Sequence, residues 1–208
     1  MAGTLLTCHV SAQLELIGVD TNESALADAT ARAADAGLTN AVFRRADAAA
    51  LLGGNLGNLG GDIDVIVALH ACGGLADAAL QLVGAAGASA LICTCCFHKN
   101  RVLAAKAPPW GVSDGARALI CRVADSCDAP HLAARARRAA SCLRLGALRR
   151  ELGRSVPHAS AELAIRTFPR EFSAQNTVLV ARVGPRSCVA TMAGDDALRD
   201  SQPPRVTS

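Results

Sequence analysis

The sequence predicts a doubly wound α/β fold, with a mostly parallel sheet and an antiparallel hairpin at its C-terminal end. The chain has 208 residues, of which 51% are hydrophobic and 19% charged, enough for one domain with a hydrophobic core. Short apolar segments that are typical of buried strands alternate with helical segments, which favours parallel pairing through helical crossovers. The last two apolar segments are joined by a short turn instead, which suits an antiparallel pair.

Strands are expected wherever a short apolar run is bounded by polar residues or by turn residues. The first ends in Asp20, and the second is followed by Asp47. A loop rich in glycine and asparagine, residues 53–61, precedes the third. The six expected strands are residues 14–19, 41–45, 63–69, 89–93, 162–167 and 177–183.

Helices are expected between these strands, with recognisable start and stop residues. Asn22 or Thr21 can cap the first, and Gly37 follows its end as a C-cap glycine. Gly84 is expected to end the second helix, and Gly146 to break the last one. The expected helices are residues 22–36, 75–83, 114–127 and 131–152.

These elements predict one domain over residues 1–183 and a disordered tail over residues 184–208, which lacks a sustained apolar period. No apolar run approaches the roughly 20 residues of a membrane span, so no membrane association is expected. Residues 1–13 have neither a basic region nor a continuous apolar stretch, and a signal peptide is therefore not expected. With an odd number of cysteines, nine, the chain fits free thiols in a reduced compartment such as the cytoplasm.

A charge run marks the last predicted helix. Between Arg135 and Arg154 there are seven arginines and one acid, Glu151. One interpretation is a solvated helix face, and the other is a flank that binds phosphate, such as that of RNA. Aromatic residues make up only 2% of the chain, which leaves little to stack bases on and weakens the RNA interpretation.

The unusual polar and sulfur side chains follow the predicted strands. They are Asp20, Asp47, His70, Cys72 and the segment 93–98. Ligands of doubly wound sheets bind at the carboxyl ends of the strands, so one site is expected there. A carboxylate at Asp20 can accept both hydroxyls of a ribose, and Asp47 can reach the exocyclic amine of adenine. Together these two acids favour a cofactor that contains adenosine.

Two motifs carry a family resemblance: Ala-Leu-His-Ala-Cys-Gly over residues 68–73, and Cys-Thr-Cys-Cys-Phe over residues 93–97. Both resemble the signature of the methyltransferase family that includes glutathione S-transferase C-terminal domain-containing proteins. The resemblance continues through residues 119–125 and Ser-Ala-Gln-Asn at residues 173–176, and spans roughly residues 14–183. It implies a Rossmann-like, class I fold that uses S-adenosylmethionine.

By the same resemblance, Asp20 would hold the ribose, Asp47 with Ala48 the adenine, and residues 68–70 would line the methyl-transfer face. The implied cofactor-binding set is Gly3, Asp20, Thr21, Asp47, Ala48, Ala68 and Leu69. The family begins with a strand and a glycine-rich turn, whereas this sequence resembles it only from about Gly3 onward. The resemblance therefore implies an N-terminally truncated domain that lacks the first strand and most of the loop. That loss should weaken cofactor binding.

Three interpretations of the cysteines remain open. They can be small buried hydrophobes at strand ends. His70, Cys72, Cys95 and Cys96 can form a soft tetrahedral zinc set, although their spacing is not that of a zinc knuckle. Cys95 or Cys72 can be a nucleophile, as in cytosine-5 RNA methyltransferases, although no acid or proline precedes Cys72 in the manner of that motif.

The resulting prediction is a methyltransferase-like domain dependent on S-adenosylmethionine, with catalytic residues His70, Cys72 and Cys95 and no metal ligand assigned. His70 would act as a general base, or else be a histidine hydrogen-bonded at a strand end. Transfer would proceed in line, driven by proximity and orientation. The acceptor stays open between RNA, a small molecule and a protein side chain. The alternatives are an inactive interaction or RNA-binding module, and a zinc-binding domain of cysteines and histidine.

Overall fold

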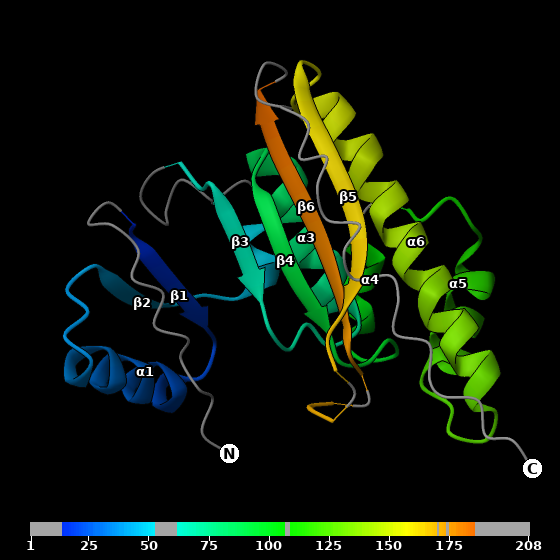
Figure 1. The fold of residues 1–208 in the computed structure, drawn as a ribbon, viewed down its shortest axis with the longest axis horizontal. Helices are drawn as coiled ribbons and strands as arrows, with labels where there is room; N and C mark the ends of the chain where they lie inside the picture. Colours follow the sequence, from blue (N-terminus) through cyan, green and yellow to red (C-terminus); the bar gives the residue numbers. More distant parts are fainter. Residues whose placement is uncertain (1–13, 53–61, 107–108, 170, 174, 186–208) are drawn as a thin grey trace, which may run out of the picture.

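The computed structural model describes residues 14–52, 62–106, 109–169, 171–173 and 175–185 (Figure 1). The predictions made for Gly3, for the loop 53–61 and for residues 186–208 lie outside this range. Within it, the strands are β1 (Leu16–Asp20), β2 (Ala41–Arg45), β3 (Val65–Ala68), β4 (Ser89–Thr94), β5 (Ala159–Thr167) and β6 (Thr177–Pro185). The helices are α1 (Glu23–Asp35), α2 (Ala48–Leu51), α3 (Gly74–Ala86), α4 (Arg101–Lys106), α5 (Asp114–Ala124) and α6 (Pro130–Ser155).

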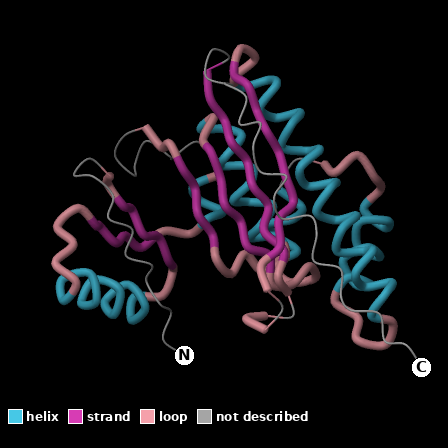
Figure 2. The backbone as a smooth tube through the Cα atoms, in the orientation of Figure 1, coloured by secondary structure: helices cyan, strands magenta, loops and turns pink. Residues whose placement is uncertain are grey.

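These strands form two sheets rather than the single sheet expected from the sequence (Figure 2). One holds β1 and β2 in parallel, and the other has the order β3-β4-β6-β5. The predicted C-terminal hairpin is confirmed, because β5 and β6 pair antiparallel from Thr167 opposite Thr177 to Ala159 opposite Pro185. Since β6 lies between β4 and β5, it is antiparallel to both. The larger sheet is therefore mixed, with β3 and β4 as its parallel pair.

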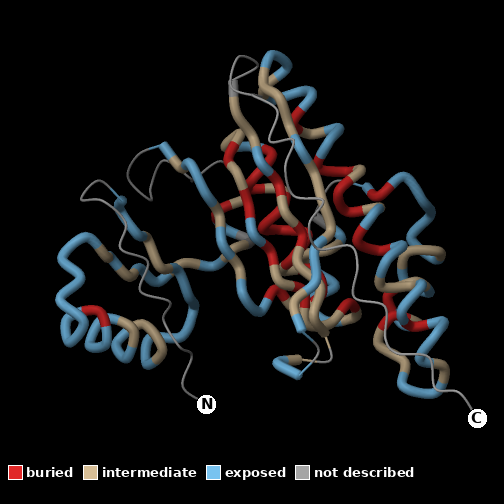
Figure 3. The backbone as a smooth tube through the Cα atoms, viewed as in Figure 1, coloured by how far each residue is buried: buried red, intermediate tan, exposed pale blue. Residues whose placement is uncertain are grey.

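The main core lies between the four-stranded sheet and helices α3 and α6 (Figure 3). Along β4, side chains alternate between the two faces, as a pleated strand requires. Ile92 is fully buried toward the core, whereas Leu91 is 46% exposed on the opposite face, beside Val67 at 57%. Among the described residues, the helices thus cover one face of this sheet.

A smaller cluster joins the two sheets. Leu51 of α2 and Leu82 of α3 are both buried, and Ile17 of β1 and Ile66 of β3 pack against them. Burial of such side chains stabilises by about 1.5–3 kcal/mol each. This cluster links the β1-β2 sheet to the rest of the molecule.

Several predicted boundaries need correction. The helix predicted over residues 75–83 is α3, which continues past Gly84 to Ala86. Gly87 is its C-cap and has a left-handed backbone conformation. Gly84 is instead a point of close approach, because a Cβ there would lie 2.5 Å from the Cγ atom of Glu151 on α6. Helix α6 runs through Gly146 without a break. The last strand, predicted to end at residue 183, extends to Pro185 as β6.

Within the described part of the chain, no helix is long and apolar enough to cross a membrane. The cysteines found there have free thiols, at positions 72, 93, 95, 96, 121, 127 and 142.

Candidate functional site

Two adjoining loops follow the parallel strands β3 and β4. We call residues 69–73 the β3 loop and residues 95–100 the β4 loop. Backbone hydrogen bonds run between these segments and their flanks: Ala71 N–H to Cys93 O (3.1 Å), Gly73 N–H to Cys96 O (2.9 Å) and Gly74 N–H to Lys99 O (2.9 Å). The Asn100 side chain adds a fourth, from Nδ2 to Cys72 O (2.9 Å). The two loops are therefore held as one unit.

This close approach depends on two adjacent glycines. Gly73 has a φ of 53°, and a Cβ on it would lie 1.9 Å from the Lys99 carbonyl oxygen. A Cβ on Gly74 would lie 2.0 Å from the carbonyl oxygen of Asn100. No side chain fits at such distances, so glycine is required for backbone contact at both positions.

The β4 loop is also braced from α5. The half-buried Asp125 carboxylate accepts hydrogen bonds from the backbone N–H of Phe97 (3.0 Å) and of His98 (2.9 Å). Hydrogen bonds to an ionised acceptor are stronger than neutral ones, at about 1.5–3 kcal/mol. Asp125 thus fixes the course of the chain directly after Cys96.

A buried ionic network contacts the β3 loop at Gly73. Asp77 of α3 accepts hydrogen bonds from Arg144 Nε (3.1 Å) and Nη2 (3.0 Å) and from Trp110 Nε1 (2.8 Å). Arg117 Nη2 lies 3.3 Å from the same carboxylate. Arg144 is 1% exposed, and its Nη2 atom also donates to the Gly73 carbonyl oxygen at 2.7 Å. The network joins α3, α5 and α6 to the β3 loop.

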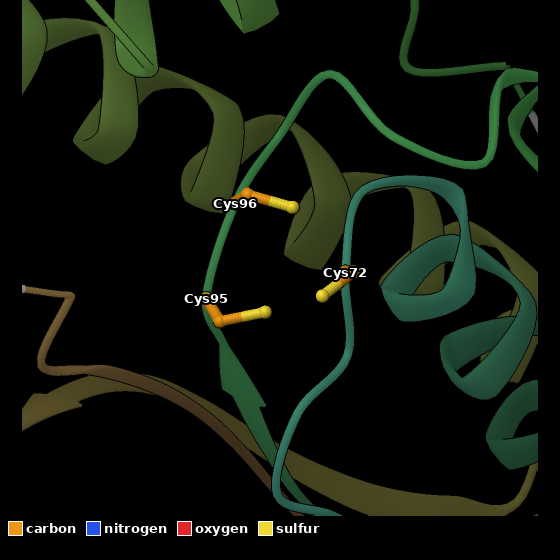
Figure 4. Close-up of side chains that lie close together, drawn as sticks. All are labelled: Cys72, Cys95 and Cys96. Atoms are coloured by element: carbon orange, nitrogen blue, oxygen red, sulfur yellow. The ribbon is translucent and has the colours of Figure 1, made fainter.

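The two loops bring three thiols together. The Sγ atoms of Cys72, Cys95 and Cys96 all lie within 4.8 Å of one another (Figure 4). Figure 4 shows Cys72 reaching from one segment toward the two cysteines of the other. His70, the fourth member of the zinc set considered from the sequence, is exposed and is not part of this group.

Burial raises the pKa values of two of these thiols. Burial raises the pKa of Cys72 above its ordinary value of 9.0, and its hydrogen bond with Cys95 raises it further. Burial likewise raises the pKa of Cys96, followed by its hydrogen bond with Cys72. A nucleophilic cysteine needs a lowered pKa, because the thiolate is the reactive form. These directions disfavour the interpretation of Cys72 as a nucleophile.

We expect slow alkylation of Cys72 and Cys96 by iodoacetamide at pH 8. The exposed Cys127 and Cys142 should react first, because access is unhindered there. The rates at Cys72 and Cys96 should keep rising as the pH passes 9.0, since their raised pKa values delay thiolate formation. Peptide mass spectrometry of protein treated with a chelator and a reductant measures each rate. Fast labelling of Cys72 at neutral pH would contradict this assignment.

The residues predicted to hold an adenosine lie at the ends of β1 and β2. Asp20 is the last residue of β1, is exposed, and accepts a hydrogen bond from the Asn22 N–H on Oδ1 (2.9 Å). Thr21 follows it and is exposed as well. Asp47 comes directly before α2, whose first residue is Ala48. Asp20 therefore lies at the carboxyl end of β1, and Asp47 lies two residues after the neighbouring parallel strand β2.

The remaining predicted residues lie at the end of β3. Ala68 is its last residue, and Leu69 and His70 follow in an exposed turn, with Leu69 70% exposed. Asp77, Arg144, Asp125 and Asn100 were not singled out from the sequence as parts of this site. Asp77 could have been noticed, because it is an acid within the otherwise apolar predicted helix 75–83. A buried carboxylate there needs a cationic partner.

The arginine run does not form one solvated face. Arg144 is buried in the network, Arg137 donates to the Ala124 carbonyl oxygen (3.0 Å), and Arg150 donates to that of Pro109 (2.8 Å). Some of the arginines of α6 thus make hydrogen bonds within the protein and stabilise its fold.

A family model described as a methyltransferase domain matches residues 2–102. The match covers just under half of the chain and includes Asp20, Asp47 and both loops. No curated protein and no solved structure matches. The match supports a methyltransferase-like function. The match does not test the more specific resemblance to glutathione S-transferase C-terminal domain-containing proteins, which stays a prediction.

Proposed function

We propose that this chain is a methyltransferase domain that uses S-adenosylmethionine. One observation of the fold supports this most directly: the carboxyl ends of β1, β3 and β4 point to the same side of the molecule (Figure 1). In α/β sheets, ligands bind at such ends. The match of residues 2–102 to a methyltransferase domain supports the same assignment. We further propose that the two sheets are parts of one doubly wound arrangement.

The exposed residues after β1 and β2 suit the adenosine part of this cofactor. Among the described residues, the hydrogen bond to the Asp20 carboxylate comes from Asn22 and goes to Oδ1, which leaves Oδ2 available. We assign Asp20 and Thr21 to the ribose hydroxyls, and Asp47 with Ala48 to the adenine. A carboxylate oxygen accepts from hydroxyl and amine donors, so the chemistry of these groups is complementary.

The methyl group would be transferred beside the β3 loop. When bound, the cofactor supplies an electrophilic methyl on its sulfonium sulfur. Ala68 and Leu69 would line this region, and the exposed His70 could take the proton that the acceptor loses. The protein's main contribution would be to hold the acceptor in line with the methyl group.

Asp20 is expected to contribute strongly to cofactor binding. Calorimetric titration with S-adenosylhomocysteine should show binding to the wild-type chain and a dissociation constant raised about 10- to 100-fold in Asp20→Asn, the loss expected for charged hydrogen bonds. Asp28→Asn, an exposed acid on α1, is the matched control and should bind normally. No heat with folded wild-type protein at millimolar ligand would overturn the cofactor assignment and favour a non-catalytic binding module.

The acceptor stays open between RNA, a small molecule and a protein side chain. The exposed arginines of α6, such as Arg135, Arg138 and Arg149, are the groups that would meet RNA phosphates. The cytoplasmic location inferred from the free thiols likewise stays a prediction.

A further inference from the structure

The three thiols of the β3 and β4 loops form a group that the proposed methyl transfer does not use. Their Sγ atoms lie within 4.8 Å of one another, and they come from two segments more than 20 positions apart in the chain. All three residues are half-buried.

The spacing of the sulfur atoms suits a metal ion. With a zinc–sulfur bond of about 2.3 Å, two thiolates of a tetrahedral site lie about 3.8 Å apart. In the structure, each pair of the three Sγ atoms is separated by no more than 4.8 Å, about 1 Å more than this distance. Binding of an ion would therefore require the three Sγ atoms to move closer together by no more than about 1 Å.

The backbone that carries the thiols is held in place before any ion binds. Gly73 N–H donates to Cys96 O, and Asn100 Nδ2 donates to Cys72 O, which tie the two cysteine segments directly together. Asp125 fixes the next residues of the β4 loop. Such support around the ligands reduces the ordering that binding requires and raises metal affinity.

Lys99 offers two groups that favour thiolates, whereas burial and the Asp125 charge oppose ionisation of the free thiols. The Lys99 backbone donates a hydrogen bond to the Cys96 thiol, and the Lys99 ammonium lies near enough to act on Cys72. Three thiolates and one Zn²⁺ carry a net charge of −1, which a neighbouring ammonium and an N–H donor stabilise.

We propose that Cys72, Cys95 and Cys96 form a three-thiolate site for Zn²⁺, with the fourth coordination position left to water or to an exogenous ligand. On binding, each S–H bond ionises, three metal–sulfur bonds form, and three protons pass to solvent, with no change of oxidation state. Soft thiolates select zinc over magnesium or calcium. Three protein ligands with an open position are the arrangement of zinc sites that exchange a ligand. This proposal does not rest on the proposed function.

The test uses the whole chain, reduced and stripped of metal with a chelator. Titration with Co²⁺ should give sulfur-to-cobalt charge-transfer absorption that saturates at one ion per chain and disappears when one equivalent of Zn²⁺ is added. Binding should release about three protons, measured in weak buffer, and the affinity should increase with pH.

Variants locate the site. Cys72→Ser, Cys95→Ser and Cys96→Ser should each raise the Zn²⁺ dissociation constant by roughly 100-fold or more, because loss of a ligand exceeds the 10- to 100-fold cost of losing an outer partner. Cys142→Ser, an exposed cysteine of α6, is the matched control and should leave it unchanged, as should His70→Ala. Circular dichroism checks that each variant is folded.

Two results would overturn the proposal. One is the absence of thiolate absorption in folded, reduced wild-type protein. The other is absorption that persists in Cys72→Ser or falls equally in Cys142→Ser, which would indicate binding at other thiols. Failure of S-adenosylhomocysteine to bind would leave these measurements unaffected, so the two proposals fail separately.

Discussion

Replacement of Arg144 by methionine is expected to lower the free energy of unfolding by about 3–5 kcal/mol. Arg144 is 1% exposed and donates twice to the Asp77 carboxylate, which is itself 5% exposed. Methionine fills a similar volume but leaves that carboxylate with fewer donors inside the protein. Removal of one partner of a buried pair costs far more than the pair contributes as a whole, because the other charge stays buried.

Urea unfolding under reducing conditions measures this effect. Arg149→Met, an exposed arginine of the same helix, is the matched control and should change the stability by no more than about 0.5 kcal/mol. The double variant Asp77→Asn with Arg144→Met should be more stable than the sum of the two single changes predicts, since the charge left behind is removed. Strict additivity would show that the two side chains do not interact.

Gly73→Ala is expected to destabilise the protein by more than about 3 kcal/mol and to separate the β3 and β4 loops. Two causes act together. The backbone of Gly73 has φ 53° and ψ −119°, a conformation that alanine rarely adopts. The new methyl group would also lie 1.9 Å from the carbonyl oxygen of Lys99, so one of the two loops must move.

Gly37→Ala separates these causes. Gly37 has a φ of 69°, but nothing lies within 4 Å of the position of its Cβ. The cost there should be the backbone strain alone, about 1–2 kcal/mol. A larger loss at Gly73 than at Gly37 then reflects the steric clash at the loop pair together with the more unusual backbone conformation of Gly73. Equal losses at Gly73 and Gly37 would contradict the predicted clash with the Lys99 carbonyl oxygen. The Co²⁺ absorption described above should be lost only in Gly73→Ala.

Local signals were sufficient to predict many of the elements. Asn22 does cap α1 through its side chain, accepting from the Ser24 and Ala25 N–H groups, and β2 has the predicted bounds. The antiparallel hairpin followed from the short turn between two strand-like segments, and it is confirmed. The sequence was insufficient to decide whether a glycine ends a helix or lies within it. Gly84 and Gly146 look like helix breakers in isolation, but both lie within helices, and Gly84 packs closely against Glu151 of α6.

The candidate site was harder to derive, because its geometry depends on contacts between distant segments. The two cysteine motifs were visible in the sequence, but the separation of His70 from the thiol group depends on the turn at the end of β3. Arg144 could not be told from the other arginines of its run, since only its contact with Asp77 places it in the core. Asp125 and Asn100 likewise acquire their roles from partners about 28 positions away.

The place of β6 between β4 and β5 has a consequence for the order of folding. During synthesis β5 emerges before β6, yet it has no neighbour in the sheet until β6 is present. Ile92 of β4 and the buried Leu179 of β6 therefore come together last, after most of the chain has left the ribosome. Domains whose pairings wait for late, distant segments fold slowly and expose apolar surface in the meantime. Until residues 177–185 have been made, β4 and β5 therefore lack the strand that pairs with both of them.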